Sequence, residues 1–161
     1  MAFDTPNGTR GARQAGRNRI ERWGNQRMAE RLRRKGDRRG NKLVLVTVGK
    51  TTGLERMTPV RWFPGEGETR LIVASASGGP RNPAWYYNIA AHPDRVRIEF
   101  AGQRIEVTPE QLHGADRDAA WRQITSTARG FARYERVTDR EIPVIRLSPR
   151  TRVEPRHPVT N

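Results

Sequence analysis

The residues of this chain that could hold a ligand gather in the stretch 73–88, which reads VASASGGPRNPAWYYN. The stretch begins as the end of an apolar strand, passes through small residues, and reaches a helix start signal at Asn82 and Pro83. Backbone amides in a loop of small residues can approach a ligand closely, and the positive end of a helix dipole favours an anion. Arg81 adds a full positive charge there. An anion-binding loop and a tight turn whose aromatic side chains fill the core fit this pattern equally well.

Two further cations flank a turn bounded by Gly49 and Gly53, with Lys50 inside the turn and Arg56 just after it. Gly-Lys-Thr after a strand is the second half of the loop that binds nucleoside triphosphates. The earlier glycine of that loop would fall on Val44, and the sequence predicts a strand rather than a helix after the turn, so we exclude a nucleotide loop. Two cations beside a tight turn suit a phosphate, whereas a solvated hairpin turn is the simpler interpretation.

The sequence lacks the residue patterns expected for thiol, metal or serine hydrolase catalysis. The chain has no cysteine, which excludes a thiol nucleophile and a cysteine-built metal site and fits a reducing cytoplasm. His92, His113 and His157 are far apart in the sequence, so we expect no metal centre. Ser75 and Ser77 lack the Gly-x-Ser-x-Gly context and have no histidine nearby, so hydrolysis is not expected either.

Positive charge is the strongest feature of the composition, with a formal net charge of +14 over 161 residues. Residues 1–42 hold 13 Lys and Arg against 4 Asp and Glu, so the sequence predicts a basic arm before a less basic body. Such an arm suits nucleic acid, anionic lipid or an acidic partner, and composition does not choose among them. No apolar run reaches the length of a membrane span, and no signal-peptide region is expected.

The arm itself is expected to contain one helix. Residues 1–15 have little to bury and are interpreted as disordered, and a helix is predicted from Arg17 to about Lys35, with Gly36 as the stop. Its apolar side chains share one half of the helical wheel with two arginines: Ile20, Trp23, Met28 and Leu32, beside Arg27 and Arg31. A helix docked on its own domain is the preferred interpretation, and a helix at a lipid headgroup boundary is the alternative.

The body reads as an α+β fold of strands joined by hairpins, with two or three helices in all, on an antiparallel sheet or small barrel. Pro59 cannot donate to a ladder, which places its strand at an edge or makes room for a bulge or a ligand. Whether the strand before Thr108 continues, or Thr108 caps a helix, is left open. Strands are expected at 43–48, 57–63, 70–75, 95–100, 104–107 and 142–147, and helices from Asn82 to Pro93 and from Ala115 to Arg129. The predicted organisation is an arm at 1–42, a cofactor domain at 43–149 and a mobile tail at 150–161.

Three blocks together carry a resemblance: GKTTGLERMTPV at 49–60, VASASGGPRNPAWYYN at 73–88 and TDREIPV at 138–144. In order and spacing they resemble the deazaflavin-dependent nitroreductase and quinone reductase family, over roughly Leu43 to Pro149. The resemblance implies a split β-barrel related to flavin-mononucleotide-binding barrels. It also implies binding of coenzyme F420 and transfer of its hydride to quinones, enones or nitroaromatics.

The resemblance also assigns site residues. The cofactor phosphate would be held by Lys50, Thr51 and Arg56. The deazaflavin would lie along an edge strand and a loop, at Thr58, Pro59, Val60, Val73, Ala74, Ser75 and Ala76. The groove would be closed by Ala84, Trp85, Tyr86 and Asn88, with Phe131 and Tyr134 over the ring on the substrate side.

Two departures concern the substrate side. Where relatives often carry Tyr-Pro-Gly-Tyr, this chain has Ala128, Arg129, Gly130 and Phe131, and Arg61 stands where an aromatic residue is common. The residues expected to face the substrate are therefore Arg61, Ala128, Phe131 and Tyr134. As the phenol nearest the acceptor, Tyr134 is the candidate proton donor.

The sequence therefore predicts a cytoplasmic F420-dependent oxidoreductase. Attachment of its basic arm to the anionic inner face of the plasma membrane is a hypothesis, and the role of the arm is left open. No nucleic-acid partner is expected under this interpretation. The alternative is a basic protein that binds nucleic acid or anionic membrane and whose barrel is catalytically inert. The acceptor, the oligomeric state and the ability of flavin mononucleotide to replace F420 are left open.

Overall fold

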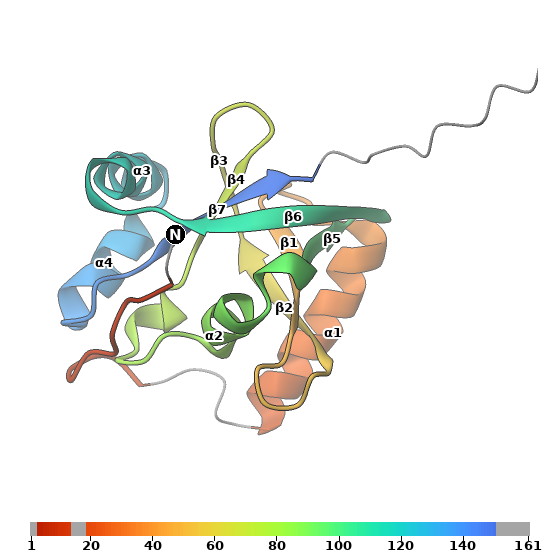
Figure 1. The fold of residues 1–161 in the computed structure, drawn as a ribbon, viewed down its shortest axis with the longest axis horizontal. Coiled ribbons are helices and arrows are strands. Elements are labelled where there is room, and N and C mark those ends of the chain that lie inside the picture. Colours follow the sequence, from red (N-terminus) through yellow and green to blue (C-terminus); the bar gives the residue numbers. More distant parts are fainter. Residues whose placement is uncertain (1–2, 14–18, 151–161) are drawn as a thin grey trace, which may run out of the picture.

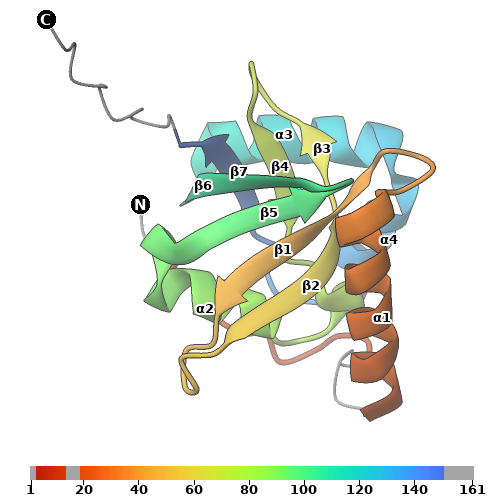
Figure 2. The ribbon, with the colours of Figure 1, turned by 90° about the vertical axis from the view of Figure 1, so that its right-hand side faces the viewer.

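The computed structural model describes residues 3–13 and 19–150 and contains a seven-stranded sheet in which all paired strands are antiparallel. The strand order is β2-β1-β5-β6-β7-β4-β3, and β2 approaches β4, so the sheet curls toward closure as a split barrel (Figures 1 and 2). The strands are β1 (Lys42–Val48), β2 (Glu55–Arg61), β3 (Phe63–Pro64), β4 (Arg70–Val73), β5 (Val96–Phe100), β6 (Gln103–Gln111) and β7 (Val144–Pro149). This confirms the predicted α+β split barrel.

The central strand β1 is apolar on both faces because each face is covered. Leu43 and Leu45 point into the barrel core, whereas Val44 and Val46 pack against α1 (Arg19–Lys35). Successive side chains of a strand point to opposite sides, so a strand buried on both sides reads as a continuous apolar run. The run at 43–48 was therefore a reliable strand signal.

The loops between strands follow their turn residues. Ala101 and Gly102 both have positive φ, 48° and 76°, and close the β5–β6 hairpin as a two-residue turn of mirror-image type. Strand β2 lies at the edge of the sheet, as Pro59 predicts. The open question at Thr108 has its answer in β6, which continues to Gln111 and pairs with β7.

The described residues form four α-helices, one or two more than the sequence predicted. Besides α1 these are α2 (Ala84–Ala91), α3 (Gly114–Thr127) and α4 (Arg129–Val137), with two 3-10 turns, η1 (Ala76–Gly78) and η2 (Pro93–Arg95). Helix α4 was missed because Gly130 was interpreted as a helix stop, whereas it lies inside α4. In Figure 1 α3 and α4 lie at one end of the molecule and α1 at the other.

Helix α1 confirms the predicted helix of the arm, but its docked face differs from the predicted apolar face. Ala29 and Leu32 are buried against β1, while Ile20, Trp23 and Met28 are 74%, 57% and 44% exposed. The small side chain of Ala29 lets the helix backbone approach the sheet. The large Trp23 side chain lies on the outer side of the helix, away from this contact. Helix α1 therefore packs on the barrel along β1, β2 and β5, as Figure 2 shows.

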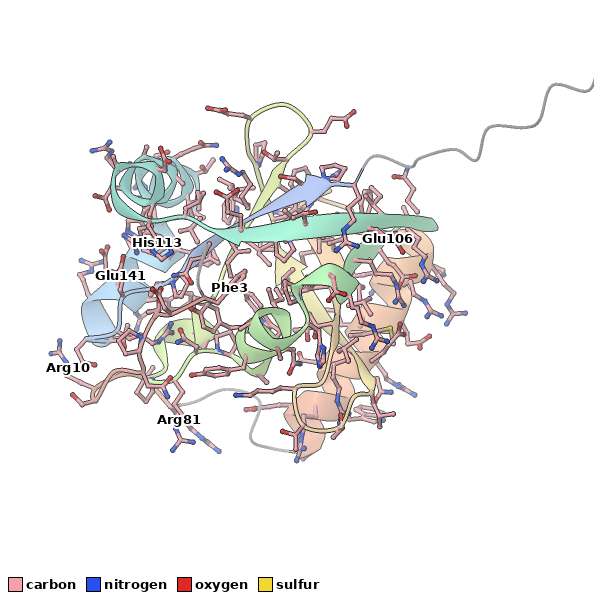
Figure 3. The ribbon with its side chains drawn as sticks, viewed as in Figure 1. Phe3, Arg10, Arg81, Glu106, His113 and Glu141 are labelled. Atoms are coloured by element: carbon pink, nitrogen blue, oxygen red, sulfur yellow. The ribbon has the colours of Figure 1, made fainter. Side chains whose placement is uncertain are left out.

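Residues 3–13 form an ordered segment, here named the strap, so the interpretation of residues 1–15 as disordered was wrong over this range. The strap runs beside α4 and α2 in Figure 1, and Figure 3 shows Phe3 near the centre of the molecule and Arg10 at its edge. The Phe3 ring packs edge-on against Tyr86 with 5.8 Å between centroids. Composition missed the strap because its partners lie 66 residues or more away in the chain.

Asp139 anchors the middle of the strap. Its carboxylate accepts hydrogen bonds from the amides of Thr9 and Arg10 and from the Thr9 hydroxyl, and these bonds lower the pKa of the Asp139 carboxyl. The Thr138 hydroxyl donates to the Arg10 carbonyl at 2.9 Å. The predicted tail at 150–161 lies outside the described residues except for Arg150, whose amide donates to the Glu106 carbonyl.

Candidate functional site

A groove of about 1360 Å³ runs along the open edge of β2, between α1 on one side and the 75–77 loop and α2 on the other. Fourteen of the residues that the sequence assigned to cofactor or substrate line it: Lys50, Thr51, Arg56, Thr58, Pro59, Val60, Arg61, Val73, Ser75, Ala76, Ala84, Trp85, Asn88 and Phe131. Positions up to 81 residues apart in the sequence therefore share one surface.

Four of the assigned residues do not line this groove: Ala74, Tyr86, Ala128 and Tyr134. Tyr86 is buried, and its hydroxyl donates to the Gln111 side-chain oxygen at 2.7 Å and accepts from the Thr5 amide at 3.0 Å. Ala74 and Ala128 are buried as well. The structure places these residues behind the groove wall, and their contact with a ligand stays a prediction.

One end of the groove is cationic and is held in shape by Asn88. The Asn88 side-chain oxygen accepts from the Lys50 amide at 2.9 Å, and its nitrogen donates to the Thr47 hydroxyl at 3.2 Å. Helix α2 thereby fixes the turn that carries Lys50, with Arg56 on the strand that follows. One cation on a fixed turn and a second on the strand that follows it suit a phosphate.

An acid at the same end does not cancel this charge. Glu55 also lines the groove, but its carboxylate is paired with Arg97, whose guanidinium makes two hydrogen bonds to it and a third to Glu99. The hydrogen bond from Arg97 lowers the pKa of Glu55, and the bond to Glu55 raises the pKa of Arg97. The groove wall remains positive overall because Glu55 has its own cation.

The loop after β4 forms the opposite wall and has an unusual backbone. Ala76, Ser77 and Gly78 all have positive φ, 45°, 54° and 78°. For the two residues with a Cβ this left-handed conformation costs about 1–2 kcal/mol each. Gly78 tolerates it, and it also needs to lack a side chain, because a Cβ there would lie 2.6 Å from the Val137 Cγ2 atom of α4.

Asn82 supports this loop, but it is not the helix cap that the sequence predicted. Helix α2 has Pro83 at its N-cap, and no side chain caps it, so Asn82 is not the cap residue. Its side-chain oxygen instead accepts from the Arg140 guanidinium at 2.6 Å, and its nitrogen donates to the Thr5 carbonyl at 2.9 Å. Asn82 thus connects the loop to Arg140 and to the strap.

Aromatic rings and one arginine form the far end of the groove. Arg61 lies over the Phe63 ring at 5.0 Å, Phe63 meets Phe131 edge-on at 5.6 Å, and Phe131 meets Tyr134 at 5.5 Å. Arg61 and Phe131 face the groove, with Tyr134 behind Phe131. The Nε of Arg61 is buried without a hydrogen-bond partner among the described residues.

The sequence did not predict that α1 would form a wall of this groove. Four polar side chains of α1 line it: Arg22, Asn25 and Arg33 from the inner face, and Gln26 at the boundary with the outer face. These positions share a helix face with Ala29 and Leu32, and that spacing was the available signal. It was missed because the larger apolar residues of the helix lie on the other side.

Comparisons with known proteins identify the class to which this fold and groove belong. The family model of the F420H(2)-dependent quinone reductases matches residues 18–149. An F420H(2)-dependent quinone reductase of Mycobacterium tuberculosis is 38% identical over 111 residues, which cover 67% of this chain and 73% of that protein. The chain belongs to the F420H(2)-dependent quinone reductase family.

Solved structures agree with this assignment. The structure of an F420-H2 dependent reductase (FDR-A) superposes with a TM-score of 0.59 at 28% identity, and the match covers 67% of this chain and 94% of that one. A domain-swapped dimer superposes with a TM-score of 0.60 at 24% identity, covering 80% of this chain and 96% of that one, and shows the fold alone. The predicted enzyme class, an oxidoreductase that uses coenzyme F420, is confirmed.

Proposed function

We propose that the groove binds reduced coenzyme F420 and a quinone together and that the enzyme reduces the quinone. The observation that carries this proposal is that one groove has both a cationic end, at Lys50 and Arg56, and an aromatic end, at Phe131. The cofactor, when bound, supplies a hydride, and with one proton this converts the quinone to a hydroquinone. The residues of the chain bind and orient the two reactants and keep water out.

Each wall has a distinct task in this proposal. Lys50, Thr51 and Arg56 hold the anionic phosphate, and the arginines of α1 extend the positive wall along the groove. Pro59 has no amide to donate, and on this side β2 pairs with no other strand in the part of the chain that the structure describes. A flat ring can therefore lie against the edge strand. Val60, Val73 and Trp85 supply apolar surface, which suits a largely apolar ring system.

The acceptor is proposed to lie between Arg61 and Phe131. A guanidinium donates to a carbonyl oxygen and stabilises negative charge on it, so Arg61 favours acceptors with a carbonyl in conjugation, which quinones and enones share. Nitroaromatics present similar anionic oxygens upon reduction. Tyr134 lies behind Phe131, and its proposed role as proton donor requires its hydroxyl to reach the acceptor.

The phosphate assignment predicts the effect of two substitutions. Lys50→Ala and Arg56→Ala should each weaken F420 binding by about 1.5–3 kcal/mol, the range for a hydrogen bond to a charged group. That corresponds to an increase of about tenfold to a hundredfold in Kd, measured by fluorescence titration. Lys42→Ala is the control, because Lys42 is exposed and does not line the groove. Unchanged affinity in both groove variants would place the phosphate elsewhere.

Tyr134→Phe tests the proton donor, because it keeps the ring and removes only the hydroxyl. If the hydroxyl donates a proton in the transition state, turnover with quinone and enone acceptors should fall by about 10²-fold. The affinity for F420 should barely change. Native turnover would show that Tyr134 serves packing against Phe131 and that the proton comes from solvent.

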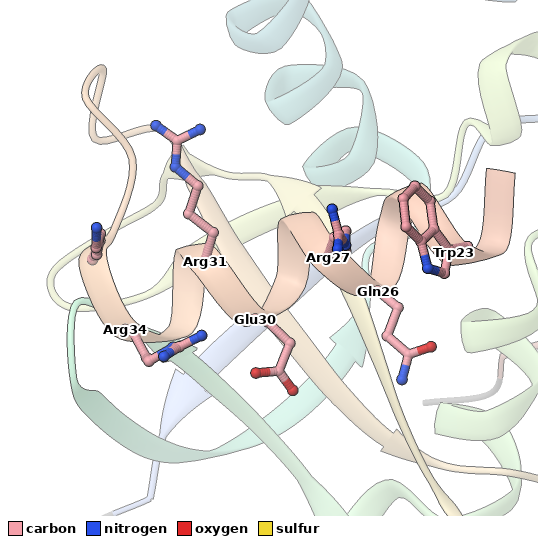
Figure 4. A pocket seen from close by; sticks show the side chains of 7 residues that line it. Trp23, Gln26, Arg27, Glu30, Arg31 and Arg34 are labelled. Atoms are coloured by element: carbon pink, nitrogen blue, oxygen red, sulfur yellow. The ribbon is translucent and has the colours of Figure 1, made fainter. Parts of the chain in front are cut away.

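A second proposal is that α1 holds the enzyme at an anionic membrane surface, where lipid-soluble quinones dissolve. No helix in the described ranges 3–13 and 19–150 is long and apolar enough to cross a bilayer. The outer face of α1 nevertheless exposes Ile20 and Trp23 among arginines, and Arg27 lies 4.3 Å from the centre of the Trp23 ring. A shallow depression of about 670 Å³ on this face is lined by Trp23, Gln26, Arg27, Glu30, Arg31, Arg34 and Lys35 (Figure 4). Interleaved aromatic and basic side chains suit a lipid headgroup region.

Co-sedimentation with phosphatidylserine vesicles tests this proposal. Binding should be strong at low salt and weak at high salt, because salt screens the contacts of the arginines with anionic lipid. Trp23→Ser should reduce sedimentation at both salt concentrations, since it removes the ring that enters the interface. Absence of sedimentation, or binding of duplex DNA alone, would contradict membrane attachment.

A further inference from the structure

The loop at 74–82, here named the ligand loop, is held from two sides other than the one that faces the groove. Ser75, Ala76 and Ser77 line the groove. Behind them the backbone is bonded to one buried side chain and to the strap, and both attachments come from distant parts of the chain. The strap lies outside residues 18–149, which the family model covers.

Arg140 holds the ligand loop from the inside. Its side chain donates to the carbonyls of Ala74 at 2.9 Å, Ser75 at 2.8 Å and Gly79 at 3.2 Å, in addition to Asn82. One guanidinium thus fixes the positions of carbonyls before and after the left-handed turn. Because the C=O and N–H of one peptide unit point in opposite directions, the bond to Ser75 also turns the Ala76 amide away from Arg140.

The strap holds the same loop from the outside. The amides of Gly8 and Ala12 donate to the carbonyls of Pro80 at 2.7 Å and Gly78 at 2.9 Å. The Asn82 amide donates in return to the Asn7 side-chain oxygen at 3.1 Å. These three bonds form a ladder along the outer side of the ligand loop.

The strap lies so close to its neighbours that a side chain has no room at two of its positions, Gly8 and Gly11. A Cβ at Gly11 would lie 2.6 Å from the Gly78 carbonyl oxygen and 2.8 Å from the Pro80 nitrogen, both backbone atoms that cannot move aside cheaply. A Cβ at Gly8 would lie 2.9 Å from the backbone nitrogen of Arg140, so the strap also fits closely against the segment that carries Arg140. Asp139, next to Arg140, fixes the strap between these two glycines through Thr9 and Arg10.

We propose that the strap and the Asp139–Arg140 pair are positioning elements of the cofactor site. They hold the ligand loop in its left-handed, binding-competent conformation from opposite sides. The identity of the ligand rests on the proposed function, whereas the effect on the loop does not. A site whose competent conformation is only partly populated binds its ligand more weakly in proportion to that population.

The proposal predicts which variants of the full-length enzyme lose the conformation of the ligand loop and which keep it. Gly11→Ala displaces the strap, Asp139→Asn weakens its anchor, and Arg140→Met removes the inner donors. Arg117→Met is the matched control for Arg140, because Arg117 is similarly buried, 7% against 4% exposed, and donates to the Ile142 carbonyl away from the loop. Gly24→Ala is the control for Gly11, because a Cβ at Gly24 meets no atom within 4 Å.

Two measurements distinguish an effect on the position of the ligand loop from a general loss of protein stability. Amide hydrogen exchange without cofactor should show residues 75–82 exchanging faster in the three test variants than in either control. Fluorescence titration should show Kd for F420 raised about tenfold or more in the test variants, with turnover at saturating F420 nearly native, since a fully loaded site has its loop in place. Arg117→Met should lower the Tm and leave both readouts unchanged.

Two outcomes would overturn the proposal. The first is native exchange at 75–82 in Gly11→Ala and Arg140→Met. The second is a loss of Tm in these variants equal to that of Arg117→Met with F420 affinity unaltered. If the unsubstituted enzyme itself fails to bind F420, the proposed function fails, and the exchange measurement alone still decides whether the strap and Arg140 hold the loop.

Discussion

The site depends on a buried cation, Arg140, that forms no ion pair with any carboxylate of the described residues 3–13 and 19–150. The side chain of Arg140 is bonded to backbone carbonyls and to Asn82, all of them neutral acceptors, and burial lowers its pKa from the ordinary value. Placing a charge in such surroundings is unfavourable unless its donors are satisfied. Arginine meets this requirement because its planar fork can serve several oxygens at once. The guanidinium in turn fixes the backbone that faces the groove.

The strain of the ligand loop fits this arrangement. Ala76 and Ser77 adopt a conformation that favours glycine, and such residues persist where their surroundings over-determine them. Arg140 and the strap hold these residues in place, and α4 packs against Gly78 from a third direction. The wall formed by β2 needs no comparable support, because β2 pairs with β1 along its whole length. The other edge of β2 lines the groove.

Much of the barrel could be predicted from the sequence, because its signals are local. The apolar run of β1, Pro59 on the edge strand and the Ala101-Gly102 turn each reflect a preference of a few neighbouring residues. The strap, the docked face of α1 and the true role of Asn82 could not be predicted in this way. Each depends on partners that only the folded chain brings together, such as Thr5 and Arg140 for Asn82. The same limit applies to the site, where resemblance located the groove residues but not the α1 wall.

The basic side chains of α1 are divided between the groove and the outer surface of the molecule. Arg22 and Arg33 of α1 line the groove, whereas Arg27, Arg31 and Arg34 lie on the opposite face of the helix. One helix therefore contributes positive charge to a ligand site on one side and to the outer surface on the other. An anionic cofactor tail is attracted to such a groove through its field as well as through direct contacts.

The most direct test of this account is a titration of the purified protein with coenzyme F420 and with flavin mononucleotide, followed by fluorescence. Both ligands carry a tricyclic ring and a phosphate, but only F420 adds an anionic oligoglutamate tail that the arginine-lined groove can bind. The account predicts that F420 binds more tightly and that added salt narrows the difference, because salt screens the contacts of the tail. Equal or tighter binding of flavin mononucleotide would contradict it.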